Sequence, residues 1–175
     1  FMTLFFLQPL IFPSWLQGYF YVVWIFIAIG WLWFVNLYNF MDGIDAITGV
    51  ETISICLGFV AVIMVGDISH ELLLPAVLLI AAVAGFLIWN FYPAKIFMGD
   101  VGSISLGYLV GWLMLELALT GEVAAAVILP GYYFADATFT LIKRVLSGEK
   151  FWTPHRKHFY QIAQNDTFFH LAWAD

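Results

Sequence analysis

Residues 72–89 read LLLPAVLLIAAVAGFLIW, a run of apolar side chains without a single charge. A helix needs about 20 such residues to cross the hydrocarbon core of a bilayer. Because this run has no polar face to turn toward water, it predicts a transmembrane helix. The whole chain agrees, since 63% of its 175 residues are hydrophobic and 10% are charged, against about 25% charged residues in a soluble domain. The predicted fold class is all-α, a polytopic transmembrane helical bundle.

Further apolar runs lie on both sides of residues 72–89. We expect spans at about 19–37, 47–65, 104–119 and 123–142, and the remainder of another one at 1–12. This makes about five full spans plus a partial N-terminal one. The short turns between antiparallel spans argue for one compact bundle, so residues 1–175 are expected to form a single membrane-embedded domain. The lone cysteine, Cys56, lies in an apolar run and is expected to be a small core residue.

The basic residues predict which ends of the spans face the cytoplasm. Successive turns must alternate between the two sides of the membrane, which places 38–46, 90–103 and 143–166 on one side and 66–71 and 120–122 on the other. All 6 Lys and Arg residues fall on the first side, namely Lys95, Lys143, Arg144, Lys150, Arg156 and Lys157. Cytoplasmic loops carry an excess of Lys and Arg, so this side is predicted to be cytoplasmic. Every unusual polar cluster of the chain lies on that side as well.

The first polar cluster is a row of side chains at steps of three: Asn36, Asn39, Asp42 and Asp45. Residues three apart are neighbours on a helix, so these form a polar stripe at the cytoplasmic end of a span. Ionisable groups near lipid usually face a bundle interior or a wet cavity. Two carboxylates here suit a hard cation, or hydrogen bonds to a sugar or base. The alternative is a solvated helix end with ordinary capping.

The second cluster is FMGDVGS at 97–103, in which Gly99 and Gly102 let the backbone approach a ligand closely. Ser103 can cap the following helix, whose free N–H groups favour anions such as phosphate. Asp100 stands where it could hold Mg2+ against those phosphates, since magnesium takes one or two carboxylates and keeps several waters. The alternative is a tight turn with an N-cap. Lys95 could pair with a phosphate or anchor the loop at the membrane surface.

The third cluster, PHRKHFYQ at 154–161, holds two histidines three residues apart with two basic residues between them. No Cys or further His completes a zinc set. The segment fits pyrophosphate better, because Arg156 and Lys157 would neutralise charge in the transition state while His155 and His158 exchange protons. A basic segment that touches anionic lipid would explain the Arg and Lys but not the paired His.

In their order and topology, the segments NLYNFMDGID at 36–45, FMGDVGS at 97–103 and HRKH at 155–158 resemble the polyprenyl-phosphate N-acetylhexosamine-1-phosphate transferases. This is glycosyltransferase family 4, which includes phospho-N-acetylmuramoyl-pentapeptide transferase. The resemblance covers about residues 19–161. The FMDGID form, together with ADATFTL at 135–141, looks closest to the branch that starts bacterial O-antigen and related surface glycans.

This resemblance implies a reaction in which undecaprenyl phosphate attacks the β-phosphate of a UDP-N-acetyl-sugar and UMP leaves. Mg2+ is the implied cofactor, with Mn2+ as a substitute. The implied catalytic residues are Asp42, Asp45, Asp100, His155 and His158, with Asp42 and Asp100 as metal ligands. The implied substrate contacts are Asn36, Asn39, Lys95, Gly99, Gly102, Ser103 and Arg156. The implied location is the bacterial inner membrane, in a multi-pass protein whose active site is cytoplasmic. The lipid bilayer is a partner, nucleic acid is not, and a homodimer is left open.

Two departures from the family pattern matter. The family's adjacent Asp-Asp pair on an earlier cytoplasmic loop has no counterpart in this chain. We therefore expect a fragment that lacks early spans and the last span and is inactive in isolation. Ala46 stands where many members have Gly, a mild change that we expect to be tolerated.

A rival interpretation is a transporter that uses intramembrane acids such as Glu116 and Asp136, but transporters tend to place such residues near the midplane. An inactive truncated homologue is the remaining alternative.

Overall fold

The structure, a computed structural model, describes residues 19–66, 68 and 70–146. The elements in chain order are α3 (Phe20–Met41), α4 (Ile47–Val65), the 3-10 turn η2 (His70–Leu72), α5 (Leu73–Asn90), α6 (Gly99–Leu119), α7 (Val123–Ile128) and α8 (Gly131–Leu146). No strand occurs within these residues, which confirms the all-α prediction. The partial span predicted at 1–12 lies outside the described residues.

Four of the helical segments are long and apolar enough to cross a membrane. They are Tyr21–Met41, Ile47–Val65, His70–Asn90 and Gly99–Leu119. Each contains a window that is strongly hydrophobic and nearly free of charge. These four spans confirm the prediction of a polytopic membrane bundle.

The fifth predicted span, at 123–142, is not one continuous helix. The chain forms α7 up to Ile128, turns at Leu129 and Pro130, and starts again as α8 at Gly131. Proline has no N–H to donate within a helix, and its ring clashes with the carbonyl four residues earlier. The prediction of a single fifth span was therefore wrong, and Pro130 is the residue that explains the break.

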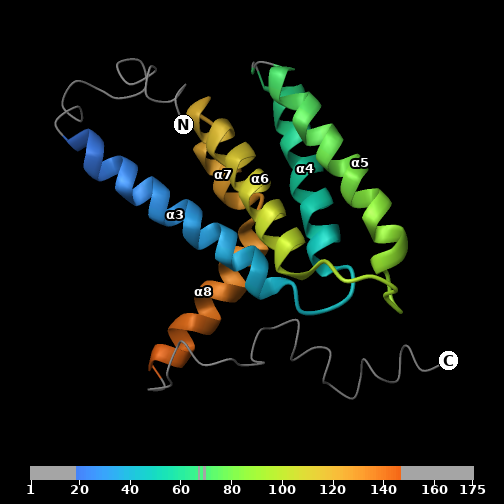
Figure 1. Cartoon of the computed structure of the whole chain (residues 1–175). Coiled ribbons are helices and arrows are strands. Elements are labelled where there is room, and N and C mark those ends of the chain that lie inside the picture. The colour runs from blue at the N-terminus through green and yellow to red at the C-terminus, as the bar shows by residue number, and fades with distance from the viewer. Residues whose placement is uncertain (1–18, 67, 69, 147–175) are drawn as a thin grey trace.

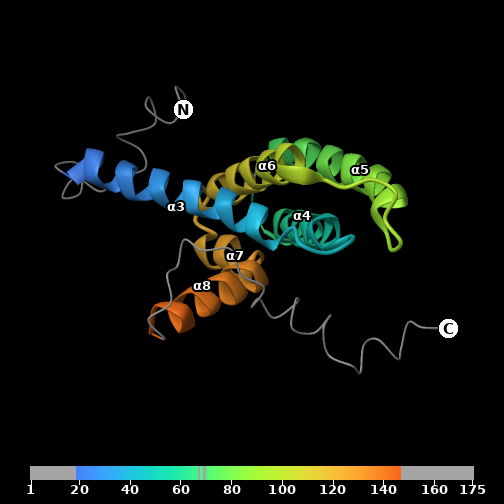
Figure 2. The same cartoon turned by 60° about the horizontal axis from the view of Figure 1, so that its bottom comes forward.

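The described helices pack in two main pairs, α3 with α6 and α4 with α5, and α4 also contacts α6. Figure 1 shows α4, α5 and α6 running side by side, with α3 approaching the lower end of α6 obliquely. The α3–α6 contact is close because glycine faces α3 at two places. A Cβ added at Gly107 would lie 2.8 Å from the Cβ of Tyr38, and one at Gly111 would lie 2.6 Å from Nε1 of Trp31. Figure 2 shows that α5 and α8 lie on opposite sides of the molecule.

Two connecting loops and four helix termini gather at one end of the bundle. Figure 1 shows the end of α3, the start of α4, the end of α5 and the start of α6 at the lower end of the α4, α5 and α6 helices, with the α4–α5 turn at their upper end. This arrangement agrees with the alternation used to assign 38–46 and 90–103 to the same side. It brings two polar segments that are distant in sequence to one place.

Two helix boundaries differ from the predicted spans. The helix α3 continues to Met41 rather than ending near residue 37, and α6 begins at Gly99 rather than near residue 104. Hydropathy marks where apolar side chains begin, whereas a helix can continue through polar residues once its hydrogen bonds are satisfied. The first two polar segments are therefore partly helical.

Candidate active site

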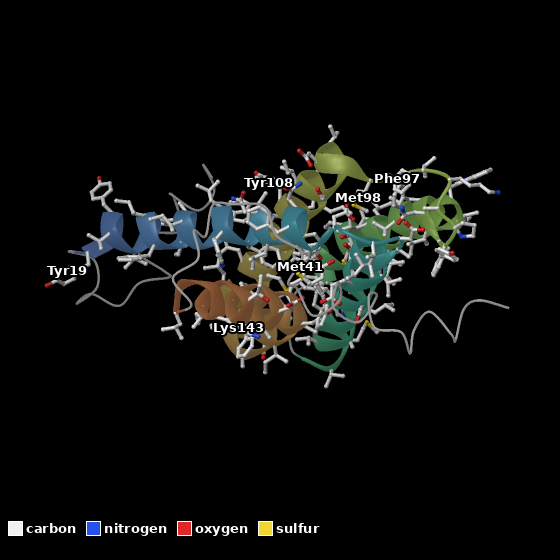
Figure 3. The ribbon with its side chains drawn as sticks, turned by 90° about the horizontal axis from the view of Figure 1, so that it is seen from below. Tyr19, Met41, Phe97, Met98, Tyr108 and Lys143 are labelled. Carbon is white, nitrogen blue, oxygen red and sulfur yellow. The ribbon has the colours of Figure 1, made fainter. Side chains whose placement is uncertain are left out.

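Asn39 joins the polar end of α3 to the first two turns of α6. Its amide Nδ2 donates to Oδ1 of Asp100 at 3.0 Å and to Oγ of Ser103 at 3.0 Å. Figure 3, seen from below, shows Met41 at the end of α3 and Met98 before α6 close to the centre of the molecule. Because these residues lie more than sixty positions apart in the sequence, the contact confirms that the first two predicted clusters meet. We call Asn39, Asp42, Asp100 and Ser103 the α3–α6 cluster.

Asp100 and Ser103 of the α3–α6 cluster lie at the N-terminal end of α6. Asp100 lies in the first turn, where the unpaired N–H groups of a helix favour negative charge. Gly99 has φ +59, a left-handed backbone that glycine adopts without strain. Ser103 does not cap the helix as predicted, because its hydroxyl donates to the carbonyl of Gly99 at 3.1 Å inside α6. The side-chain capping prediction was wrong because the helix starts four residues earlier.

Asp42 follows α3 directly and is half-buried. Burial raises the pKa of its carboxyl above the ordinary value of 3.8, the hydrogen bond from the Thr48 side chain lowers it, and the charge of Asp100 raises it further. A like charge raises a carboxyl pKa in this way only when the two groups are close. The cluster thus presents two carboxylates that repel each other at the end of the spans.

A second set of hydrogen bonds holds the loops around this cluster. The buried amide of Asn90 accepts from the N–H of Ala46 at 3.0 Å and donates to the carbonyl of Ile96 at 2.9 Å. The carboxylate of Asp45 accepts from the N–H of Ala94 at 3.0 Å. Asp45 therefore ties the α3–α4 loop to the α5–α6 loop, which is a positioning role that the sequence did not predict.

Asn36, Lys95 and Gly102 were also predicted to contact the substrate, and the structure shows the local contacts of each. Asn36 is exposed, and its amide donates to the carbonyl of Leu32 at 2.7 Å within α3. Lys95 is exposed and places Nζ 5.4 Å from the ring centre of Trp89. Gly102 packs against Met98, whose Cγ lies 2.3 Å from where a Cβ would be.

Three predicted residues of the third cluster cannot be placed. His155, Arg156 and His158 lie outside the residues that the structure describes. Their roles stay predictions.

The polar residues within the helices have local partners. Glu116 accepts from Nε1 of Trp112 at 3.0 Å, and the buried Asp136 accepts from the hydroxyl of Thr140 at 3.3 Å. Cys56 is fully buried and makes no disulfide, as expected for a core residue.

Sequence reasoning missed Asn90 and Thr48 as parts of this region. Asn90 is the single polar residue that ends an otherwise apolar span, and Thr48 lies one helical turn after Asp45. A polar side chain that is buried at a span end needs partners. That requirement was the available signal for Asn90, whereas nothing in the sequence showed which partners it would find.

Magnesium fits the donor set of the α3–α6 cluster. Carboxylate, amide and hydroxyl oxygens are hard donors, and a cation would offset the burial and the like charge of Asp100 that raise the pKa of Asp42. Within the described residues no three His, Cys, Asp or Glu side chains gather as a complete metal cage. Such a site suits a cation that takes few protein ligands and completes its shell with waters and phosphates.

Comparison with known proteins gives three findings. The model of glycosyl transferase family 4 matches residues 2–118. The chain is 34% identical over 137 residues to a probable undecaprenyl-phosphate N-acetylglucosaminyl 1-phosphate transferase of Bacillus subtilis, covering 74% of this chain and 38% of that protein. It is 33% identical over 146 residues to the phospho-N-acetylmuramoyl-pentapeptide-transferase of Clostridium beijerinckii, covering 81% of this chain and 44% of that protein.

The matches cover only part of each curated relative, and none is to a solved structure. The chain spans about two fifths of the length of these curated relatives. No solved structure matches the chain. The family model includes α3 to α6 and ends before α7 and α8.

Proposed function

Because this chain belongs to glycosyl transferase family 4, we propose that it forms the part of a transferase that binds the nucleotide and the metal ion. The enzyme would transfer N-acetylhexosamine 1-phosphate from a UDP-sugar to undecaprenyl phosphate. The observation that carries the proposal is the contact of Asn39 with both Asp100 and Ser103. It gathers oxygen donors at one end of four apolar spans. A lipid phosphate that stays at the membrane surface and a soluble nucleotide can both reach such a place.

In the proposed reaction an oxygen of undecaprenyl phosphate forms a bond to the β-phosphorus of the UDP-sugar. The bond between that phosphorus and the oxygen bridging to the α-phosphate breaks, and UMP leaves with the bonding electron pair. Lipid diphosphate-sugar is the other product. Transfer of this kind depends mainly on positioning and on electrostatic stabilisation of the phosphoryl oxygens.

The chain's own residues supply positioning in this scheme. Asp100 and Asp42 would hold the magnesium ion, while Asn39 fixes the orientation of Asp100. Magnesium, when bound, neutralises charge on the phosphates. The N-terminal end of α6 favours phosphate through its free N–H groups. Asp45 holds the α5–α6 loop through the N–H of Ala94, and its catalytic role stays a prediction.

The basic segment at 155–158 completes the proposed site. Arg156 would pair with a phosphate, and His155 and His158 would exchange protons with the phosphates. Support for this part comes from the resemblance and from the placement of the segment after α8, on the predicted cytoplasmic side. We further propose that the product starts O-antigen or another envelope glycan, as the 135–141 segment suggests.

The test measures transfer in membranes from cells that express the full-length gene, because this chain spans about two fifths of the length of its curated relatives. Membranes receive Mg2+, undecaprenyl phosphate and one labelled UDP-N-acetyl-sugar at a time. UMP release and label in the lipid fraction are measured together. We expect both signals for at least one UDP-N-acetylhexosamine, and neither when undecaprenyl phosphate or the divalent cation is left out.

Two outcomes decide the proposal. Transfer that continues in EDTA would contradict the metal assignment. Absence of lipid-linked sugar with every UDP-sugar, alongside ion flux in reconstituted vesicles, would favour the transporter instead. The family match currently favours the transferase.

A further inference from the structure

Asn90 is a buried amide at a point where three parts of the chain meet. It ends α5, and its side chain is 6% exposed. Its Oδ1 accepts from the N–H of Ala46 at 3.0 Å, and its Nδ2 donates to the carbonyl of Ile96 at 2.9 Å. Figure 1 shows the α5–α6 loop running from the end of α5 past the start of α4 to the start of α6. One side chain therefore joins α4, α5 and the loop before α6.

The bond to Ala46 supplies a partner that the start of α4 lacks. Ala46 is the N-cap residue of α4, and alanine has no side-chain acceptor with which to cap the helix. Its backbone is left-handed, with φ 65, and the residue is buried. A buried N–H needs a hydrogen-bond partner, and Asn90 provides it from the neighbouring helix. The start of α4 is thus fixed by a residue of α5.

Ile96 is fixed by both of its backbone polar groups. Its N–H donates to the carbonyl of Trp89 at 3.3 Å, and its carbonyl accepts from the amide of Asn90. The N–H of Lys95 also donates to the carbonyl of Trp89, at 2.8 Å. The loop therefore folds back onto the last turn of α5 just before the segment at 97–103 begins.

Asn90 connects the two short segments that carry the acids of the α3–α6 cluster. Ala46 follows Asp42 by four residues, and Ile96 precedes Asp100 by four residues. Four residues span at most about 14 Å even when fully extended. Each acid is therefore confined to a short distance from a backbone group that the amide of Asn90 holds.

We propose that Asn90 is a positioning residue that sets the separation of Asp42 and Asp100, and with it the affinity of the site for the divalent cation that they share. The inference rests on the proposed function and adds a residue outside the segments at 36–45, 97–103 and 155–158. Asn39 restrains Asp100 by direct contact, whereas Asn90 acts on both acids through the backbone.

The chemistry of the amide accounts for asparagine at this position. The site needs one acceptor for an N–H and one donor for a carbonyl, and a primary amide offers both in a fixed geometry. A carboxylate at position 90 would accept from Ala46 but would repel the carbonyl of Ile96, and leucine would offer neither group. A buried polar group that loses its partner costs about 1–3 kcal/mol.

The test compares four variants of the protein expressed from the full-length gene. Asn90→Leu removes both hydrogen bonds and keeps a similar shape. Asn90→Ser removes them as well, because its hydroxyl is too short to reach both backbone groups, but it keeps the position polar and serves if Asn90→Leu fails to fold. Asn90→Gln keeps the donor and the acceptor. Thr52→Val is the control, because it removes buried hydrogen bonds to Tyr38 and to the carbonyl of Thr48 instead.

Two quantities are measured for each variant. Purified protein without substrate is titrated with Mn2+, and bound metal is followed by electron paramagnetic resonance. The Mg2+ concentration that gives half-maximal transfer is the second quantity. It separates positioning from folding, because a smaller fraction of folded enzyme lowers the maximal rate and leaves the half-saturating concentration unchanged. Thermal midpoints report stability.

We expect Asn90→Leu and Asn90→Ser to weaken Mn2+ binding about tenfold, the lower end of the roughly 10- to 100-fold cost of losing groups that orient metal ligands. The half-saturating Mg2+ concentration should rise by a similar factor. Asn90→Gln should stay within about threefold of the parent, since it keeps both hydrogen-bonding groups. Thr52→Val should lower the thermal midpoint and bind Mn2+ like the parent.

Parent-like Mn2+ binding and Mg2+ dependence in both Asn90→Leu and Asn90→Ser would overturn the inference. Equal weakening in Thr52→Val would also overturn it, since that result would point to a general loosening of the core. An Asn90→Gln variant that binds Mn2+ no better than Asn90→Leu is the third contrary result. If the parent transfers sugar phosphate while these expectations fail, the proposed function stands; if the parent neither binds Mn2+ nor transfers, both fail.

Discussion

Asp100 offers the most direct test at the scale of single residues. In an Asp100→Asn variant the new amide oxygen could still accept from Asn39, so the substitution removes the charge and keeps the shape. We expect turnover to fall at least about a hundredfold, as for loss of metal-mediated charge stabilisation. The thermal midpoint should change little. Near-normal UMP release by this variant would refute the role of Asp100.

Asp42 links the site to the pH dependence of stability. Burial and the nearby Asp100 raise the pKa of its carboxyl, so the folded chain binds the proton more tightly than the unfolded chain. This stabilisation is fully present below the unfolded pKa and is lost as the pH rises through the folded pKa. In EDTA at pH 7, Asp42→Asn should therefore unfold at a temperature no lower than the parent.

The measurement is the thermal midpoint of both proteins between pH 7 and pH 4. The midpoint of the parent should rise relative to that of Asp42→Asn as the pH falls. A parent that loses stability relative to the variant on acidification would show that the carboxylate, rather than its protonated form, is favoured in the fold.

Ala46 has a backbone conformation that glycine adopts more readily than alanine. Its backbone has φ 65 at the start of α4, a left-handed conformation that costs a residue with a Cβ about 1–2 kcal/mol. Glycine removes this cost but loses more freedom on folding. Ala46→Gly should therefore stabilise the protein by about 0.5–1 kcal/mol. Gly99→Ala is the control in the opposite direction: it adds a Cβ at φ +59, where the surrounding space is open, and should destabilise the protein. Equal thermal midpoints for the parent, Ala46→Gly and Gly99→Ala would contradict a cost of the left-handed backbone at these positions.

At the scale of helices, the spans were predictable and the site contacts were not. The apolar runs predicted about five full spans, and four of them are confirmed because burial in lipid depends on composition along the chain and not on long-range contacts. The capping role of Ser103 was predicted wrongly because α6 starts four residues earlier, at Gly99, so that the Ser103 hydroxyl donates within the helix to the carbonyl of Gly99. Pro130 was a local signal for the break between α7 and α8 that hydropathy alone did not detect.

The contact between α3 and α6 can be tested through Gly107. A Cβ there would lie 3.1 Å from the backbone Cα of Val35 and 2.8 Å from the Cβ of Tyr38, so the helices must separate to admit it. Overpacking of this kind costs about 1–3 kcal/mol. Gly107→Ala should lower the thermal midpoint and also reduce transfer, because it moves Asn39 away from α6. Gly85→Ala, which meets nothing within 4 Å, should leave transfer unchanged; the same loss in both variants would contradict this role of the α3–α6 contact.

At the scale of the whole molecule, the chain separates its polar groups along the membrane normal. The α3–α6 cluster and the loops tied by Asn90 lie at one end of the spans, and the α4–α5 turn lies at the other (Figure 1). Charged side chains are costly near the bilayer centre. A one-ended arrangement therefore allows a wet site to form while the four spans remain apolar.

This arrangement predicts which loops a reagent can reach from each side of the membrane. The α6–α7 turn carries Glu122 and lies at the opposite end from Lys95, which follows α5 (Figure 1). Both side chains are exposed, and Cys56 is fully buried, so Cys56→Ala gives a background without interference. In intact cells a membrane-impermeant maleimide should label Glu122→Cys and leave Lys95→Cys unlabelled until the membrane is opened. The positive-inside rule requires that direction, because every Lys and Arg is predicted to lie on the side of Lys95. Labelling of Lys95→Cys in sealed cells would reverse the orientation and remove the site from the compartment that supplies UDP-sugars.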